Sequence, residues 1–219
     1  MPESLTAAVE DYVKAIYTLD SGEGAVTTTA LAERLDVRPA SVSGMLPKLT
    51  QLGLVEHVPY RGVRLTERGT RVALEVVRHH RLLELFLVES LGMTWDEVHA
   101  EAEVLEHVLS EELEELIAAK LGDPAFDPHG DPIPSRELTV PADESRNLYA
   151  LDPGEQGTFV RVSDADPAML RFLAERGIAP GAGLEVIERQ PFDGPLSVRV
   201  GDDVHVLGAV LARAMRVVA

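Results

Sequence analysis

Residues 27–65, TTTALAERLDVRPASVSGMLPKLTQLGLVEHVPYRGVRL, decide the fold of the N-terminal part of the chain. The Thr27–Thr29 run supplies a helix start, and residues 30–35 read as a short helix. A tight turn at residues 36–38 follows, and Pro39 then suits the first turn of another helix. The pattern therefore predicts two helices joined by a three-residue turn.

The flanking residues extend this pattern on both sides. Gly53 closes the second helix, and residues 54–58 and 63–65 read as two short strands of a hairpin. Upstream, apolar residues recur at helical spacing and predict a helix over about residues 6–19, with the Ser21–Gly24 stretch ending it. Three helices followed by a hairpin predict a winged helix-turn-helix, a fold that places its second short helix in the DNA major groove.

Charge supports this interpretation. The chain has a net charge of −17, yet residues 34–73 carry seven basic and three acidic residues. A basic region in an acidic protein is a candidate phosphate-contacting face. The alternative is a protein-docking module of the same shape, which the basic region disfavours. Pro47 lies inside the expected reading helix, where it removes a hydrogen bond and predicts a kink. The candidate DNA-binding residues are Arg38, Pro39, Ala40, Ser41, Ser43 and Lys48 of the helix and Arg61 and Arg64 of the wing.

A second informative stretch is VHAEAEVLEH, residues 98–107, within a helix expected over about residues 95–109. Its candidate metal ligands are His99, Glu103, Glu106 and His107. They fall within roughly a 100° arc of one helix face. Imidazoles and carboxylates that converge from one face suit a borderline or hard divalent cation. The alternative is a solvated acidic face.

Upstream, a long helix is expected over residues 67–91. His80 and Glu84 lie four residues apart in it and share one of its faces.

Composition limits the remaining possibilities. The 219 residues include no cysteine, which excludes disulfides and thiolate metal sites and fits a reducing cytoplasm. No secretory signal is expected at the start of the chain. No run of about 18 apolar residues predicts a membrane span. We therefore expect a cytoplasmic protein.

The C-terminal part of the chain changes character. Residues 122–157 are rich in Pro, Gly and Asp and read as an irregular linker. After Gly157, β-patterned runs alternate with one helical stretch at residues 168–176 and predict a β-barrel domain of about 60 residues. The expected strands are residues 158–162, 184–189, 196–200 and 204–207.

Several segments together resemble the diphtheria toxin repressor family, bacterial metal-dependent regulators of iron and manganese genes. The resemblance covers nearly the whole chain. It implies a mainly α protein with a small β domain: a winged helix (1–73), a helical dimerisation and metal-binding domain (74–140), a linker (141–157) and an SH3-like barrel (158–219). The segments are EDY (10–12), IY (16–17), VRPASVS (37–43), HHRLLE (79–84), VHAEA (98–102), EHVLS (106–110) and DPHGDPIP (127–134).

The resemblance also implies two metal sites. The primary site would use Asp11, Glu103, Glu106 and His107. The ancillary site would use His80, Glu84 and His99. In three-domain relatives the barrel lends polar ligands to the ancillary metal, and the segment Asp164–Met169 offers Asp166 for this role.

Metal identity follows from the donor types. Iron-type members of the family place a Met and a Cys where this chain has Asp11 and Glu103, as manganese-type members do. A carboxylate-rich site without sulfur suits hard Mn²⁺, with Fe²⁺ second. Zn²⁺, Co²⁺ or Cd²⁺ are expected to substitute in vitro.

We therefore predict a dimeric, metal-activated DNA-binding repressor of metal-homeostasis genes, acting on a palindromic operator. The alternatives are a metal-responsive docking module and a metal-dependent hydrolase. A hydrolase would need an open coordination position and a nearby base. The sequence has no His-Glu-x-x-His motif and no Gly-rich phosphate loop to favour a hydrolase.

Overall fold

The computed structural model describes residues 5–20 and 25–218. The expected helix end at Ser21–Gly24 lies outside these ranges. The chain divides into two compact units. The first contains residues 1–80, 104–114 and 134–139, and the second contains residues 81–103, 115–133 and 140–219.

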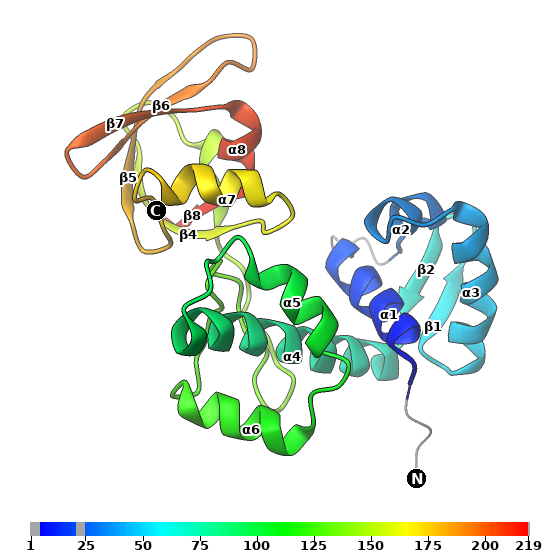
Figure 1. Cartoon of the computed structure of the whole chain (residues 1–219). Coiled ribbons are helices and arrows are strands. Elements are labelled where there is room, and N and C mark those ends of the chain that lie inside the picture. Colours follow the sequence, from blue (N-terminus) through cyan, green and yellow to red (C-terminus); the bar gives the residue numbers. More distant parts are fainter. Residues whose placement is uncertain (1–4, 21–24, 219) are drawn as a thin grey trace. The chain divides into compact units, whose positions relative to one another are not determined.

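The first unit contains the predicted winged helix-turn-helix, which is confirmed (Figure 1). The Thr27 side chain caps α2 by accepting a hydrogen bond from the Ala30 backbone N–H. The strands β1 and β2 pair as an antiparallel hairpin with Val55 opposite Leu65. The elements are α1 (Ala7–Leu19), α2 (Thr28–Arg34), α3 (Pro39–Gln51), β1 (Val55–Val58) and β2 (Gly62–Leu65).

The core of this domain explains why its helices and strands could be predicted from the sequence. Each helix and strand turns one apolar face inward, so helical and alternating spacings both appear in the sequence. Pro47 lies within α3, and the helix continues to Gln51. Fully buried core residues include Val13, Leu31, Val42, Leu49 and Leu54.

Three further helices follow the wing. They are α4 (Glu67–Leu91), α5 (Val98–Leu105) and α6 (Glu111–Lys120). The α4 bounds agree with the prediction, but α5 is shorter than the expected helix over residues 95–109. Its end is set by a tight turn, in which the Val108 N–H donates to the Leu105 carbonyl. Glu106 and His107 therefore lie in the turn after α5 instead of on its face.

The second unit contains the predicted small β domain, which is also confirmed. Its six strands form an antiparallel sheet in the order β3-β8-β4-β5-β6-β7, shown with α7 and α8 in Figure 1. The elements are β3 (Arg146–Asn147), the 3₁₀ helix η1 (Leu148–Ala150), β4 (Gln156–Val162), α7 (Pro167–Ala174), β5 (Gly183–Arg189), β6 (Leu196–Val200), β7 (Asp203–Leu207), α8 (Ala209–Ala214) and β8 (Met215–Val218).

The irregular-linker interpretation of residues 122–157 needs correction at its C-terminal end. Residues 146–150 form β3 and η1, and Leu148 and Leu151 are fully buried in the core of the β domain. Because the surrounding segment is rich in Pro, Gly and Asp, its composition did not indicate that these two leucines belong to a core. Among the described residues, no helix is both long and apolar enough to cross a membrane.

Candidate metal centres and DNA-binding surface

The first group of candidate ligands, the Asp11 cluster, consists of Asp11, Glu106 and His107. His107 Nε2 lies 2.9 Å from Asp11 Oδ1 and 3.6 Å from Glu106 Oε1. Each residue offers a ligand atom within 4.8 Å of the others. The Glu106 side chain is fully buried, whereas that of Asp11 is 38% exposed. Helix α1 supplies Asp11, and the turn after α5 supplies the other two.

Glu10 orients the imidazole of this cluster. Glu10 Oε2 lies 2.6 Å from His107 Nδ1, and since a carboxylate only accepts, Nδ1 is the donor. The other ring nitrogen, Nε2, therefore faces Asp11. A metal-binding histidine commonly donates its second N–H to a carboxylate in this way. Glu10 was not among the predicted site residues, although it directly precedes Asp11 in the EDY segment.

His80 and Lys14 also contact Glu106. His80 Nδ1 lies 2.5 Å from Glu106 Oε2, and Lys14 Nζ lies 2.9 and 2.7 Å from the two carboxylate oxygens. Thus His80, predicted for the ancillary site, contacts a predicted primary ligand. Glu103, the fourth residue predicted for the primary site, has its Oε1 atom 3.6 Å from His99 Nε2.

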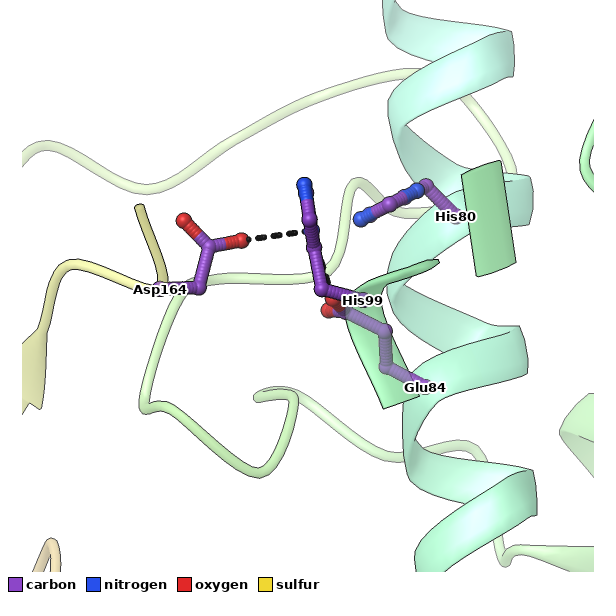
Figure 2. Close-up of side chains that lie close together, drawn as sticks. All are labelled: His80, Glu84, His99 and Asp164. Carbon is purple, nitrogen blue, oxygen red and sulfur yellow. Dashed lines mark hydrogen bonds and ion pairs between the residues drawn. The ribbon is translucent and has the colours of Figure 1, made fainter. Parts of the chain in front are cut away.

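The second group gathers around Glu84. His99 Nδ1 lies 3.0 Å from Asp164 Oδ2 and 3.3 Å from Glu84 Oε1. Figure 2 shows these three side chains with His80, which stands one turn before Glu84 on α4. The hydrogen bond with Asp164, and then the one with Glu84, raises the pKa of His99 to about 10 against the effect of burial. Burial would raise the pKa of Asp164, but the hydrogen bond from His99 lowers it.

His129 approaches the other oxygen of Glu84. Its ring is fully buried, and Nε2 donates to the Trp95 carbonyl at 2.7 Å. The remaining nitrogen, Nδ1, has no hydrogen-bond partner among the described residues. It lies 3.6 Å from Glu84 Oε2 and 4.0 Å from Asp127 Oδ1. Burial opposes protonation of this ring, yet the facing Glu84 carboxylate raises the pKa of His129 to about 9. We call Glu84, His99, Asp127, His129 and Asp164 the Glu84 cluster.

A short loop, residues 127–131, builds this side of the cluster. Asp127 Oδ1 accepts from the backbone N–H groups of His129 and Asp131 at 2.8 and 2.9 Å. Gly130 adopts a φ of +89°, and a Cβ there would lie only 1.8 Å from the Val160 carbonyl oxygen. The Val162 N–H also donates to the His129 carbonyl. The loop thus packs on β4, whose end leads to Asp164.

The β domain contributes Asp164 to the cluster, two residues before the predicted Asp166. Asp166 instead caps α7, because its side chain accepts from the Ala168 N–H at 2.9 Å. The predicted segment Asp164–Met169 therefore reaches the cluster through Asp164, whereas Asp166 caps α7. Asp127 and His129 were not among the predicted site residues, although both lie in the DPHGDPIP segment that carries the family resemblance.

The donor chemistry of both clusters fits a divalent cation. In the Asp11 cluster the ligand atoms lie within 4.8 Å of one another. In the Glu84 cluster those of Glu84, His99 and Asp164 do so, and separately those of Glu84, Asp127 and His129. Neither cluster contains sulfur. In the Glu84 cluster, a buried nitrogen without a hydrogen-bond partner faces two carboxylates. Such a nitrogen and such oxygens are ligands that Mn²⁺, Fe²⁺ and Zn²⁺ accept.

The predicted DNA-binding residues all lie on the exposed side of α3 and the wing. Arg38 is the N-cap residue of α3, and Pro39 occupies its first turn. Ser43 donates its hydroxyl to the Pro39 carbonyl at 3.1 Å. Arg64 forms an ion pair with Glu56 across the hairpin, with 2.5 Å between Nε and Oε1. Because Arg64 already has a carboxylate partner, Arg61 is the better placed of the two wing arginines for a phosphate.

A winged helix whose first helix supplies a carboxylate to a carboxylate and imidazole cluster defines a class of protein, the metal-responsive DNA-binding regulators. Comparison with known families agrees. Residues 4–63 match the model "Iron dependent repressor, N-terminal DNA binding domain". Residues 66–135 match "Iron dependent repressor, metal binding and dimerisation domain", and residues 146–219 match the FeoA domain.

Individual relatives span nearly the whole chain. The iron-dependent repressor IdeR of Mycobacterium tuberculosis is 34% identical over 97% of both chains. The diphtheria toxin repressor of Corynebacterium efficiens is 32% identical over 86% of both. A solved manganese-dependent transcriptional repressor in complex with manganese is 46% identical, with a TM-score of 0.90 over 96% of this chain and 99% of that one.

The chain therefore belongs to the iron-dependent, or diphtheria toxin, repressor family of metal-dependent DNA-binding transcriptional repressors. The predicted family, fold class and repressor function are confirmed. The family match at the C-terminus also agrees with the SH3-like domain that the resemblance implied.

Proposed function

We propose that this chain is a manganese-activated repressor, with Fe²⁺ as the second-ranking activator. The observation that carries the proposal is the absence of sulfur from both ligand clusters in a chain without cysteine. Carboxylate oxygens suit hard Mn²⁺, but later metals such as Zn²⁺ would bind the same groups more tightly. Selection for Mn²⁺ would therefore depend on coordination number and on the supply of metal in the cell, and we expect Zn²⁺, Co²⁺ or Cd²⁺ to substitute in vitro. The 46% identical structure contains manganese, and a relative that is 30% identical was solved with Zn²⁺.

We assign the primary centre to Asp11, Glu106 and His107, with Glu103 kept as the predicted fourth ligand. The distances within the Asp11 cluster support this assignment. For the ancillary centre we propose the Glu84 cluster, in which Asp164 replaces Asp166 as the ligand from the β domain. His80 was predicted for this centre and stays in the proposed ancillary set, and its Nδ1 atom also lies 2.5 Å from Glu106 Oε2.

The primary centre couples metal to DNA through α1. Asp11 belongs to the winged helix, whereas Glu106 and His107 belong to the turn after α5. A cation held by both groups restricts the orientation of α1 relative to that turn. A bound metal shifts the equilibrium between two conformations of the protein only to the extent that it binds one of them more tightly than the other. Asp11 is the residue that makes the affinity depend on the orientation of the DNA-binding domain.

The proposed DNA-bound form is a homodimer on a palindromic operator. The helical domain matches a dimerisation model. Val108, Leu113 and Leu116 are 77%, 49% and 62% exposed there, which supports a protein interface. Two copies of α3 would then enter successive major grooves. We place this activity in the cytoplasm. We keep the domain boundaries 1–73 and 74–140 as part of the proposal, and we start the β domain at residue 146, where β3 begins, in place of the predicted 158.

Operator binding with and without metal tests the proposal. Fluorescence anisotropy with DNA from the protein's own promoter should show at least tenfold tighter binding with Mn²⁺, about 1.4 kcal/mol. A scrambled duplex of equal length is the control. Equal operator affinity for the metal-free and Mn²⁺-loaded protein would falsify metal gating. Activation by Fe²⁺ alone would remove the preference for manganese.

A further inference from the structure

Lys14 is a cation inside the proposed primary centre. It lies in the middle of α1, and its side chain is only 11% exposed beside the fully buried Glu106. Its Nζ atom donates to both oxygens of Glu106, at 2.9 and 2.7 Å, and lies 3.1 Å from His80 Nδ1. Burial of a lysine is costly unless a partner compensates its charge, and here Glu106 is that partner.

The Glu106 carboxylate faces two places where positive charge can reside. Its Oε1 atom lies 3.6 Å from His107 Nε2, within the Asp11 cluster. The Lys14 ammonium donates to both oxygens, and His80 Nδ1 lies 2.5 Å from Oε2. A carboxylate oxygen has two lone pairs, so Glu106 can accept from Lys14 and still present an oxygen to the cluster.

We propose that Lys14 is a tethered cation that shares Glu106 with the primary metal and weakens the binding of that metal. The inference rests on the proposed function of the Asp11 cluster as a metal centre. The ammonium compensates the buried Glu106 charge when the metal is absent, and it repels a divalent ion bound to the same carboxylate. Both effects lower metal affinity. Lys14 therefore raises the metal concentration at which the repressor responds.

A purely structural ion pair predicts the opposite result. If Lys14 only holds α1 against the turn after α5, its removal loosens the ligands and weakens metal binding. If Lys14 acts as a tethered cation, its removal strengthens metal binding while the metal-free protein loses stability. The sign of the change in affinity therefore distinguishes the two roles.

The experiment uses the full chain carrying Asp164→Ala, which removes one ligand from the ancillary centre. Lys14→Met keeps a side chain of similar length without charge, Lys14→Gln is a second neutral variant, and Lys14→Arg keeps the charge. Isothermal titration calorimetry with Mn²⁺ measures affinity, and thermal melting with and without Mn²⁺ provides a second measurement.

Both neutral variants should bind Mn²⁺ at least tenfold more tightly, and Lys14→Arg should stay within threefold of the parent. The metal-free melting temperature of Lys14→Met should fall, while its rise on adding Mn²⁺ should grow. Unchanged or weaker Mn²⁺ binding by folded neutral variants would overturn the proposal. If His107→Ala in the same background leaves Mn²⁺ binding unchanged, the Asp11 cluster is not the metal centre and the proposed function fails separately.

Discussion

At the scale of single residues, Asp11 and His107 separate metal binding from its effect on DNA. In Asp11→Ala the metal keeps Glu106 and His107, so binding should weaken but persist, while stimulation of operator binding should be largely lost. In His107→Ala both should fall by at least tenfold, about 1.4 kcal/mol, because an imidazole ligand is gone. Calorimetry measures metal binding, and anisotropy measures DNA binding on the same preparations. If saturating Mn²⁺ fully stimulates operator binding by Asp11→Ala, the metal does not act by linking α1 to the turn after α5.

Glu10 provides a second test at this scale. Its carboxylate holds His107 Nδ1 at 2.6 Å and directs Nε2 toward Asp11. Loss of such a partner typically costs 10–100-fold in metal affinity, so we expect Glu10→Ala to bind Mn²⁺ about tenfold more weakly in calorimetry. Glu33→Ala, which removes an exposed glutamate from α2, is the charge-matched control. Equal affinities in the two variants would show that His107 needs no orienting partner.

Part of the proposed ligand set could be predicted from the sequence, for a physical reason. Residues three or four positions apart on a helix share a face, so the pairing of His80 with Glu84 was visible from spacing alone. Glu84 and His129 are 45 positions apart, and only the packing of the 127–131 loop brings them together. The choice between Asp164 and Asp166 depended on which aspartate caps α7, a local backbone detail that composition does not reveal.

At the scale of elements, the 127–131 loop has a steric requirement that can be measured. Gly130 and Gly154 both have a φ of +89°, but a Cβ at Gly130 would overlap the Val160 carbonyl, whereas a Cβ at Gly154 meets nothing within 4 Å. Gly154→Ala should therefore cost about 1–2 kcal/mol from backbone strain alone. Gly130→Ala should cost about 3 kcal/mol or more because the overlap adds to that strain.

Chemical denaturation measures both variants. Mn²⁺ titration should also show a weaker ancillary centre in Gly130→Ala only, since its loop carries Asp127 and His129. Similar losses of stability in the two variants would mean that the loop moves away from β4 without cost.

Elements with strong periodicity were predictable, and short ones were not. The three helices and the wing of the first unit appear within a few residues of their expected bounds. The strands β3 and β8 have two and four residues, and α8 has six. Segments of that length hold too few apolar positions to distinguish a period of 2 from one of 3.6. The early end of α5 was missed because contacts from Lys14, His79 and His80 hold Glu106 in a turn.

At the scale of the whole molecule, uneven charge sets how DNA binding responds to salt. The basic region of residues 34–73 is proposed to contact phosphate, while the rest of the chain is strongly acidic. The logarithm of operator affinity should fall linearly with the logarithm of salt concentration. Arg61→Ala should reduce the slope by about 1. Arg64→Ala should change it less, because Glu56 already pairs with Arg64. Anisotropy over a salt series checks this, and equal slopes for both variants would contradict the assignment of wing contacts.

The sulfur-free ligand clusters have a consequence for oxidative stress. Peroxide attacks thiolates first, and the sulfenic and sulfinic acids that form no longer bind metal as the thiolate did. The clusters described here offer peroxide only carboxylates and imidazoles, and the chain has no cysteine to oxidise. The proposed metal ligands of this repressor therefore include no thiolate for peroxide to oxidise, unlike those of a relative with a thiolate ligand. If manganese is the activating metal, we expect the repressor to keep its response to manganese in an oxidising environment.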